Sequence, residues 1–200
     1  MRYLDRAQSR LPQPWRTAVD WLVTIVVAIG FVLVFEAEVA KPYRIPSSSM
    51  EPTLHCARPG AWCLGSSNDR VIANRLAYRF SSPKRGQIVV FNAPAEAATK
   101  CGGEGGVFVK RLIGLPGDVV REDRGAVSVD GRRLSEPYVH PSFRDYGSGT
   151  WRVPAGRYFF MGDDRAHSCD SREWGTVPRS SLIGPVIATY WPLNRISIGG

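Results

Sequence analysis

The chain has 200 residues, of which 44% are hydrophobic and 22% are charged, and this suits one globular domain with an appendage. Its 20 glycines and 15 prolines make it rich in turns but stay below the level typical of disordered chains. The formal net charge of +8 comes from scattered basic residues without a run of five. This scatter disfavours a nucleic-acid partner and favours contact with a membrane surface.

The longest apolar segment lies near the N-terminus. Residues 21–35 are almost wholly apolar, and with the five that follow they would form a helix of about 30 Å, roughly one bilayer core. Basic residues before the segment outnumber those just after it: Arg2, Arg6, Arg10 and Arg16 against Lys41 and Arg44. The positive-inside rule therefore predicts a cytoplasmic tail over 1–16, a transmembrane helix over 17–40 and an extracytoplasmic domain over 41–200.

The sequence does not favour removal of this helix as a leader peptide. A cleavable leader needs small residues one and three positions before the cut. A cut after Ala40 would place Glu38 at the third position, and a cut after Ala37 would place Phe35 there. We therefore expect an anchor that stays, with a buried core helix as the alternative.

Four cysteines follow the anchor and would lie in an oxidising compartment, where disulfides persist. They are Cys56, Cys63, Cys101 and Cys169. Three full pairings are possible, and the short loop favours Cys56–Cys63, with Cys169 as the candidate for a free thiol. A zinc site made by His55 and the first three cysteines is an alternative, although it lacks the closely paired cysteines of structural zinc sites.

Beyond residue 49, short β-type runs separated by turn residues replace helical periodicity. The Asp130-Gly131 pair predicts a hairpin turn, and residues 95–106 are expected to form a loop. The expected strands are 71–74, 87–91, 107–113, 119–121, 126–129, 132–134, 158–161 and 186–190. The sequence thus predicts an all-β catalytic domain, with folded antiparallel sheets or a barrel-like form, on one N-terminal transmembrane α-helix.

Three consecutive serines lie between two prolines in residues 44–54, RIPSSSMEPTL. Each proline fixes its own φ and moves the preceding residue out of the α region. Ile45 and Glu51 are therefore expected to be extended or turning, and the serines to lie on a held backbone outside a helix. A nucleophilic serine needs such a mount, whereas a plain polar turn after a membrane helix is the alternative.

Lys110 shares one face of its expected strand with Phe108 and Leu112, while Arg111 lies on the other face. Apolar surroundings disfavour the ammonium and would lower the lysine pKa from about 10.4 to about 8. This shift corresponds to a desolvation free energy of roughly 3.3 kcal/mol. A lysine shifted in this way is a competent general base, whereas an arginine stays protonated. The alternative is a structural lysine whose side chain reaches water at a sheet edge.

Acids and arginines alternate in residues 161–172, MGDDRAHSCDSR, directly after an expected strand. We expect a rigid hydrogen-bonded loop with a pairing of Asp170 and Arg172. The loop lacks the ligand spacing of an EF-hand, which weakens a metal site formed by Asp163, Asp164, His167 and Asp170. A serine–histidine–aspartate triad using His55, His140 or His167 is a further alternative.

Taken in order, these motifs resemble those of the type I signal peptidases. An N-terminal anchor is followed by IPSSSMEPTL, RGQIVVF, VKRLIGLPGD, VDGRRLSEPYV, MGDDRAHSCDSREWG and LIGPVIATYWPL, which together cover nearly the whole chain. The resemblance implies a membrane-bound serine endopeptidase that removes signal peptides from secreted preproteins after a small-x-small site, without metal or cofactor. It also implies a cytoplasmic (inner) or organellar membrane, with a secretion translocon nearby.

The resemblance further implies roles for particular residues. Ser49 corresponds to the nucleophile and Lys110 to the general base. The oxyanion hole would be formed by the backbone N–H of Ser49 and the hydroxyl of Ser47, and Ser168 would orient the lysine. The supporting residues would be Asp163, Arg165, Asp170 and Arg172. Departures from the family pattern fall on residues without an assigned role, namely Ser48, Gln87 and Asp164.

Membrane lipid is a further expected partner of the β-domain. The candidate contacts are Phe143, Tyr146, Trp151, Trp174 and Trp191, although core packing is the alternative for each. Two other functions compete with the peptidase. One is a soluble self-cleaving repressor-type peptidase, and the other is a catalytically inactive membrane-tethered β-domain that binds partner proteins. The anchor disfavours the first, and retention of both Ser49 and Lys110 disfavours the second.

Overall fold

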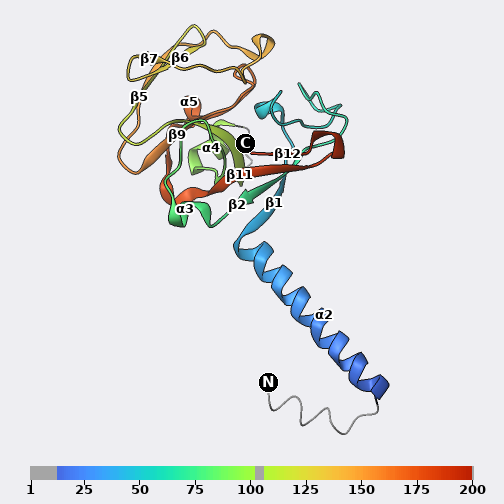
Figure 1. Cartoon of the computed structure of the whole chain (residues 1–200). Coiled ribbons are helices and arrows are strands. Elements are labelled where there is room, and N and C mark those ends of the chain that lie inside the picture. Colours follow the sequence, from blue (N-terminus) through green and yellow to red (C-terminus); the bar gives the residue numbers. More distant parts are fainter. Residues whose placement is uncertain (1–12, 102–105, 200) are drawn as a thin grey trace. The chain divides into compact units, whose positions relative to one another are not determined.

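The computed structural model describes residues 13–101 and 106–199, and Figure 1 traces its elements. The chain divides into two compact units, Met1–Val39 and Ala40–Gly200. The tail predicted over 1–16 falls largely on residues 1–12, which lie outside the described residues.

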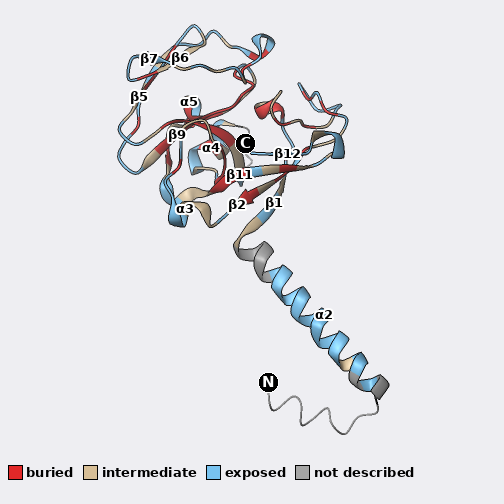
Figure 2. Ribbon diagram, in the orientation of Figure 1, coloured by how far each residue is buried: buried red, intermediate tan, exposed pale blue. Residues whose placement is uncertain are grey.

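The first unit contains the helix α2 (Gln13–Glu38), 26 residues long. Apolar side chains along it, such as those of Trp21, Val27 and Phe31, are exposed, and Figure 2 draws most of the ribbon between its grey ends in pale blue. In residues 13–101 and 106–199, no helix is both long enough and apolar enough to cross a membrane. The transmembrane span over 17–40 stays a prediction.

Antiparallel sheets make up the second unit. The larger sheet has the order β1-β2-β11-β3-β4-β9-β10, with β12 beside β11. Its strands are β1 (Ala40–Arg44), β2 (Arg70–Asn74), β3 (Ile88–Asn92), β4 (Val107–Gly114), β9 (Arg157–Met161), β10 (Val177–Pro178), β11 (Leu182–Trp191) and β12 (Ser197–Ile198). The smaller sheet, β7-β6-β5-β8, contains β5 (Val119–Asp123), β6 (Ala126–Val129), β7 (Arg132–Arg133) and β8 (Gly149–Arg152).

Short helices connect the strands. The α-helical segments are α3 (Ala77–Phe80), α4 (Ala95–Lys100) and α5 (Ser171–Trp174). Single turns of 3-10 helix are η1 (Ser48–Met50), η2 (Pro141–Phe143), η3 (Arg179–Ser181) and η4 (Leu193–Arg195).

The predicted antiparallel β-domain is confirmed, and its expected strands correspond to β2, β3, β4, β5, β6, β7, β9 and β11. The hairpin is also correct, because β6 pairs with β7 in a register that places Val129 opposite Arg132. Asp130 and Gly131 have φ values of 49° and 78°, the left-handed conformation that a tight two-residue hairpin turn requires. Strands β1, β8, β10 and β12 were not predicted.

Two local predictions are wrong. The expected loop over 95–106 begins with the helix α4, because its AEAATK sequence is rich in good helix formers and places Glu96 in the first turn. Ser48 and Ser49 lie in the 3-10 turn η1 rather than outside a helix. The flanking Glu51 is extended, with φ −63° and ψ 145°, as its proline neighbour predicts.

Strand β3 lies in the middle of the larger sheet and is buried on both faces. Its alternate side chains enter different apolar clusters. Ile88 and Val90 pack with Val71, Met50 and neighbours, whereas Val89 and Phe91 pack in a cluster with Leu112, Phe160 and Trp174. Because β4 pairs directly with β3, the part of β4 that carries Lys110 lies deep in the unit.

The structure pairs all four cysteines. Cys56 is bonded to Cys63, which confirms the short-loop prediction. Cys101 is bonded to Cys169, so the prediction of a free Cys169 is wrong. These residues are 68 positions apart, and contacts of α4 with α5 explain how they meet. With Cys56 and Cys63 joined to each other, the proposed zinc ligand set is also excluded.

We expect Phe91→Ala to lower the free energy of unfolding by about 3–5 kcal/mol, because it leaves a cavity in a fully buried cluster. The Phe91 ring stacks on Phe160 with centroids 4.5 Å apart. Denaturant unfolding of the full chain in mild detergent would measure the change. The matched control is Phe80→Ala, whose ring is 85% exposed and should matter by less than about 0.5 kcal/mol. Equal effects of the two changes would contradict the proposed core.

Candidate active site

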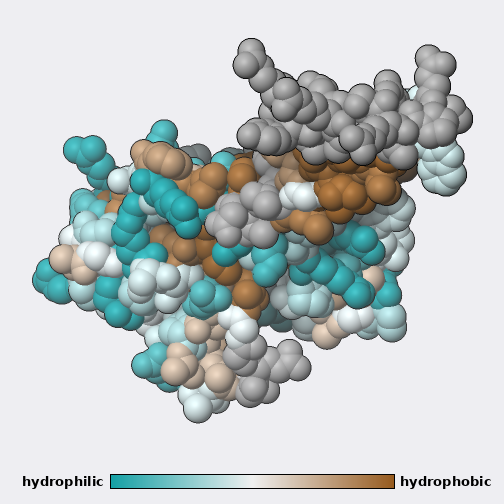
Figure 3. All heavy atoms as spheres, turned by 90° about the horizontal axis from the view of Figure 1, so that it is seen from below, coloured by the Kyte–Doolittle hydropathy of each residue, from teal (hydrophilic) through white to brown (hydrophobic). Residues whose placement is uncertain are grey.

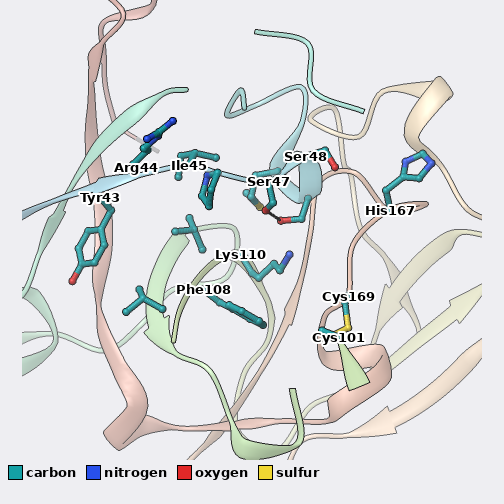
Figure 4. Close-up of a pocket in the computed structure, with 15 residues that line it drawn as sticks. Tyr43, Arg44, Ile45, Ser47, Ser48, Cys101, Phe108, Lys110, His167 and Cys169 are labelled. Carbon is teal, nitrogen blue, oxygen red and sulfur yellow. Dashed lines mark hydrogen bonds between the residues drawn. A yellow bond between two sulfur atoms is a disulfide. The ribbon is translucent and has the colours of Figure 1, made fainter. Parts of the chain in front are cut away.

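A pocket of about 340 Å³ is lined by the end of β1, the serine segment, the start of β4 and the loop after β9. Of the predicted site residues, Ser47, Ser49 and Lys110 line it. Figure 4 shows Lys110 extending beneath the serine segment, with Tyr43 on one side and His167 on the other. The structure thus brings the serine and lysine motifs, which are about 60 residues apart in the sequence, to one cavity.

The serine segment is held by its apolar neighbours. Ile45 and Met50 are buried in the cluster beneath it, which leaves Ser49 half-buried between them. The backbone carbonyl of Ser49 accepts a hydrogen bond from the N–H of Asp164 at 3.3 Å. Ser47 is extended and exposed, and its Oγ lies 3.3 Å from the Oγ of Ser49. Both hydroxyls therefore face the same region of the pocket.

Lys110 is only 4% exposed, and it lies opposite Val89 in the pairing of β4 with β3. Its Nζ donates a hydrogen bond to Ser168 Oγ at 3.1 Å and lies 5.9 Å from the centre of the Phe108 ring. Burial lowers the pKa of Lys110 to about 8, and the nearby carboxylate of Asp170 only partly opposes this shift. The lowered pKa expected from its apolar neighbours is thus confirmed.

The loop after β9 approaches the serine segment at Gly162. A Cβ at this position would meet Ser168 Oγ at 2.2 Å and the Ser49 carbonyl oxygen at 2.3 Å. The Ser49 backbone and the hydrogen-bonded Ser168 side chain could not move far enough to make room for a Cβ atom. Only glycine therefore allows Ser168 and Ser49 to come so close together, and any larger residue would push the lysine partner away from the serine segment.

Asp170 and Arg172 hold this loop together. The carboxylate of Asp170 accepts hydrogen bonds from the N–H of Gly162 at 2.9 Å and from Arg172 Nε at 2.9 Å. Burial by itself would raise the pKa of Asp170, but the hydrogen bonds and charge of Arg172 outweigh it and lower that pKa. The predicted pairing of Asp170 with Arg172 is confirmed. Because its pKa is lowered, the Asp170 carboxylate stays ionised near Lys110.

The other two predicted supporting residues have partners that the sequence did not indicate. Asp163 is buried and accepts two hydrogen bonds from Arg111, at 2.8 Å from Nε and 2.6 Å from Nη2. Arg165 instead pairs with Glu136 and donates from Nε to the carbonyl of Gly162 at 3.0 Å. The alternation of side chains along β4 predicted that Arg111 lies on the opposite face from Lys110. The sequence did not indicate that Asp163 is the partner of Arg111.

The structure gives each histidine a partner other than a serine hydroxyl. His55 contacts the carboxylate of Glu51, and His140 accepts from the N–H of Ser142 at 3.3 Å. His167 contacts Asp164 at 2.9 Å through Nδ1. These contacts do not support a serine–histidine–aspartate triad. Among residues 13–101 and 106–199, no group of three histidine, cysteine or acidic side chains is arranged to hold a metal ion.

The predicted lipid contacts divide in the structure. Trp174 and Phe143 are buried, and the half-buried Trp151 packs against an apolar cluster, so these three take part in packing. Tyr146 and Trp191 are exposed.

The family model described as "Signal peptidase, peptidase S26" matches residues 18–191. The chain therefore belongs to the signal peptidase family, peptidase S26. It is 40% identical to a probable signal peptidase I-2 of Synechocystis sp. over 195 residues, which covers 97% of this chain and 83% of the relative. It is 37% identical to a signal peptidase I of Leptolyngbya laminosa, covering 95% of this chain and 89% of the relative.

A crystal structure of a signal peptidase I from Enterococcus faecalis is 31% identical, with a TM-score of 0.44, and covers 52% of this chain and 97% of that one. The extent of the matches to the sequence relatives identifies the chain as a hydrolase, a serine endopeptidase of the signal peptidase I type.

We expect Lys110→Met to stabilise the fold at pH 7 by up to about 3 kcal/mol, because it removes a buried ammonium. The folded-state pKa is about 8, below the ordinary value of 10.5, so the unfolded chain binds more protons between these values. Wild-type stability should therefore rise with pH from about 8 to about 10.5, and the advantage of the variant should vanish above that range. Denaturant unfolding of both proteins across this pH range tests the prediction. A difference in unfolding free energy that does not change with pH would contradict the lowered pKa of Lys110.

Proposed function

We propose that this protein removes signal peptides from secreted preproteins after a small-x-small site, with Ser49 as nucleophile and Lys110 as general base. The observation that carries the proposal is the buried Lys110 in the same pocket as Ser49, with a pKa lowered to about 8. About a tenth of such lysines are neutral at pH 7, which is enough for a general base.

In the proposed mechanism, neutral Lys110 takes the hydroxyl proton of Ser49 while Oγ attacks the carbonyl carbon of the scissile peptide bond. Negative charge develops on the carbonyl oxygen, and the Ser49 backbone N–H and the Ser47 hydroxyl stabilise it. The Lys110 ammonium then gives its proton to the departing amine. Lys110 is thereby neutral again and activates the water that hydrolyses the acyl-enzyme.

Ser168 orients the base in this mechanism. Its Oγ accepts a hydrogen bond from Lys110 Nζ at 3.1 Å, which limits the directions in which the amine lone pair can point. Asp170, Arg172, Asp163 and Arg165 support the site from behind by holding the loop that carries Ser168. These four act on the geometry of the catalytic pair rather than on the substrate.

The pocket also supports the proposed preference for small side chains. Ile45, Phe108 and Val109 contribute apolar side chains to its lining. We infer that this apolar lining binds an alanine methyl group and excludes larger side chains by steric contact.

Membrane attachment through α2 is part of the proposal, with the N-terminus in the cytoplasm and the β-domain outside the cytoplasmic or an organellar membrane. The exposed apolar side chains along α2 support membrane attachment. Figure 3 views the molecule from below, and hydrophobic residues, drawn in brown, form areas on this face. Two disulfides in the β-domain fit an oxidising compartment. A nearby translocon would deliver the preproteins.

We expect Ser49→Ala and Lys110→Met each to abolish cleavage of a purified preprotein in detergent while the variants stay folded. Wild-type protein should cut after a small-x-small site, as sequencing of the product N-terminus would show. Its kcat/KM should rise with pH up to about 8 and then level off as Lys110 loses its proton. Cleavage by all three proteins would contradict the proposed pair, and no cleavage by folded wild type would favour a partner-binding β-domain.

Ser47→Ala should slow cleavage by about 10²–10³, the usual cost of losing an oxyanion-hole donor, and should affect kcat far more than KM. The control is Ser128→Ala, which removes a serine hydroxyl in β6 of the smaller sheet and should leave both constants unchanged. A kcat for Ser47→Ala within a few-fold of wild type would remove Ser47 from the oxyanion hole.

A further inference from the structure

The rings of Trp62 and His167 stack, with centroids 4.0 Å apart and planes inclined by 18°. His167 is one of the residues that line the catalytic pocket. Trp62 does not line the pocket itself but packs against His167. Trp62 remains 61% exposed in spite of the stacking. The two rings therefore continue the wall of the pocket outwards and leave most of the indole open to a binding partner.

The loop that carries Trp62 is fastened to the serine segment. Glu51, two residues after Ser49, is fully buried, and its Oε1 accepts from the backbone N–H groups of Cys56 and Leu64, each at 3.0 Å. The Cys56–Cys63 disulfide closes the same loop. Charge-assisted bonds at both ends of a disulfide loop make it rigid, so Trp62 has a set position relative to Ser49.

The backbone of Trp62 is held in an unfavourable conformation. Its φ is 63°, in the left-handed region that bulky residues rarely adopt. Such a conformation persists only where the surrounding structure imposes it, and these residues are common at binding sites. Here the imposed conformation leaves the indole against His167.

The chemistry of the proposed reaction decides which part of the substrate reaches these rings. The departing amine must take its proton from Lys110, whose Nζ points to Ser168. His167 directly precedes Ser168, and Figure 4 shows it on the opposite side of the pocket from Tyr43. The residues before the cleaved bond thus lie on the apolar side, with Ile45 and Phe108, and the first residue after it passes His167.

We propose that Trp62 and His167 form a subsite for the side chain of the first residue after the cleaved bond, and that this subsite favours an aromatic side chain. The inference rests on the proposed function, because it needs a peptide chain crossing Ser49. An aromatic side chain stacks on the open face of the indole, whereas an alanine methyl group has no flat face to place there.

The test uses two preproteins that differ only in the residue after the cut, Phe in one and Ala in the other. Wild-type protein should show a kcat/KM about threefold to tenfold higher for Phe, the range expected of an aromatic pair. Trp62→Ala should bring this ratio close to one, and Trp62→Tyr should keep it above one. Trp62→Leu, which keeps apolar bulk without a ring, should also lose the preference and serves if the alanine variant does not fold.

The control is Phe80→Ala, an exposed aromatic residue of α3 outside the pocket lining, which should keep the wild-type ratio. A wild-type ratio of one, or an unchanged ratio in the Trp62 variants without an aromatic ring, overturns the subsite while the proposed function stands. A folded wild-type protein that cuts neither preprotein overturns the proposed function itself, and the two failures are thereby distinguished.

Discussion

The site depends on one constraint, which is that the amino group of Lys110 stays out of water. Packing on both faces of the larger sheet shields the strands around it, and this burial lowers the lysine pKa to about 8. The fold bears the cost of desolvating the amino group, and a fraction of the lysine is neutral near pH 7 as a result. In the proposed mechanism, the same burial that weakens the fold supplies the chemistry.

The proposed mechanism also needs Ser49 near this lysine, and ion pairs around the loop after β9 hold that loop against the serine segment. Arg172 holds Asp170, and Arg111 holds Asp163, so each of these buried carboxylates has a cationic partner. Removing one partner would leave an uncompensated buried charge, which costs several kcal/mol. Gly162 then lets the fastened loop touch the backbone of Ser49.

One disulfide lines the pocket, and the other closes a loop that contacts a residue of its lining. Cys101 and Cys169 line it, and the loop closed by Cys56 and Cys63 carries Trp62 to His167. Glu51 connects that loop to the serine segment. Variation in these loops could therefore change substrate preference without altering the buried lysine and its partners.

Sequence alone determined the features that depend on near neighbours along the chain. Alternation predicted the strands and the apolar face of Lys110, the prolines predicted the extended Glu51, and Asp130-Gly131 predicted the hairpin. Tertiary structure decided which distant residues meet. Asp163 pairs with Arg111 across 52 positions, and Cys169 pairs with Cys101 across 68. Such partners follow from strand order and loop packing, because many arginines and cysteines are chemically equivalent until the fold brings one of them close.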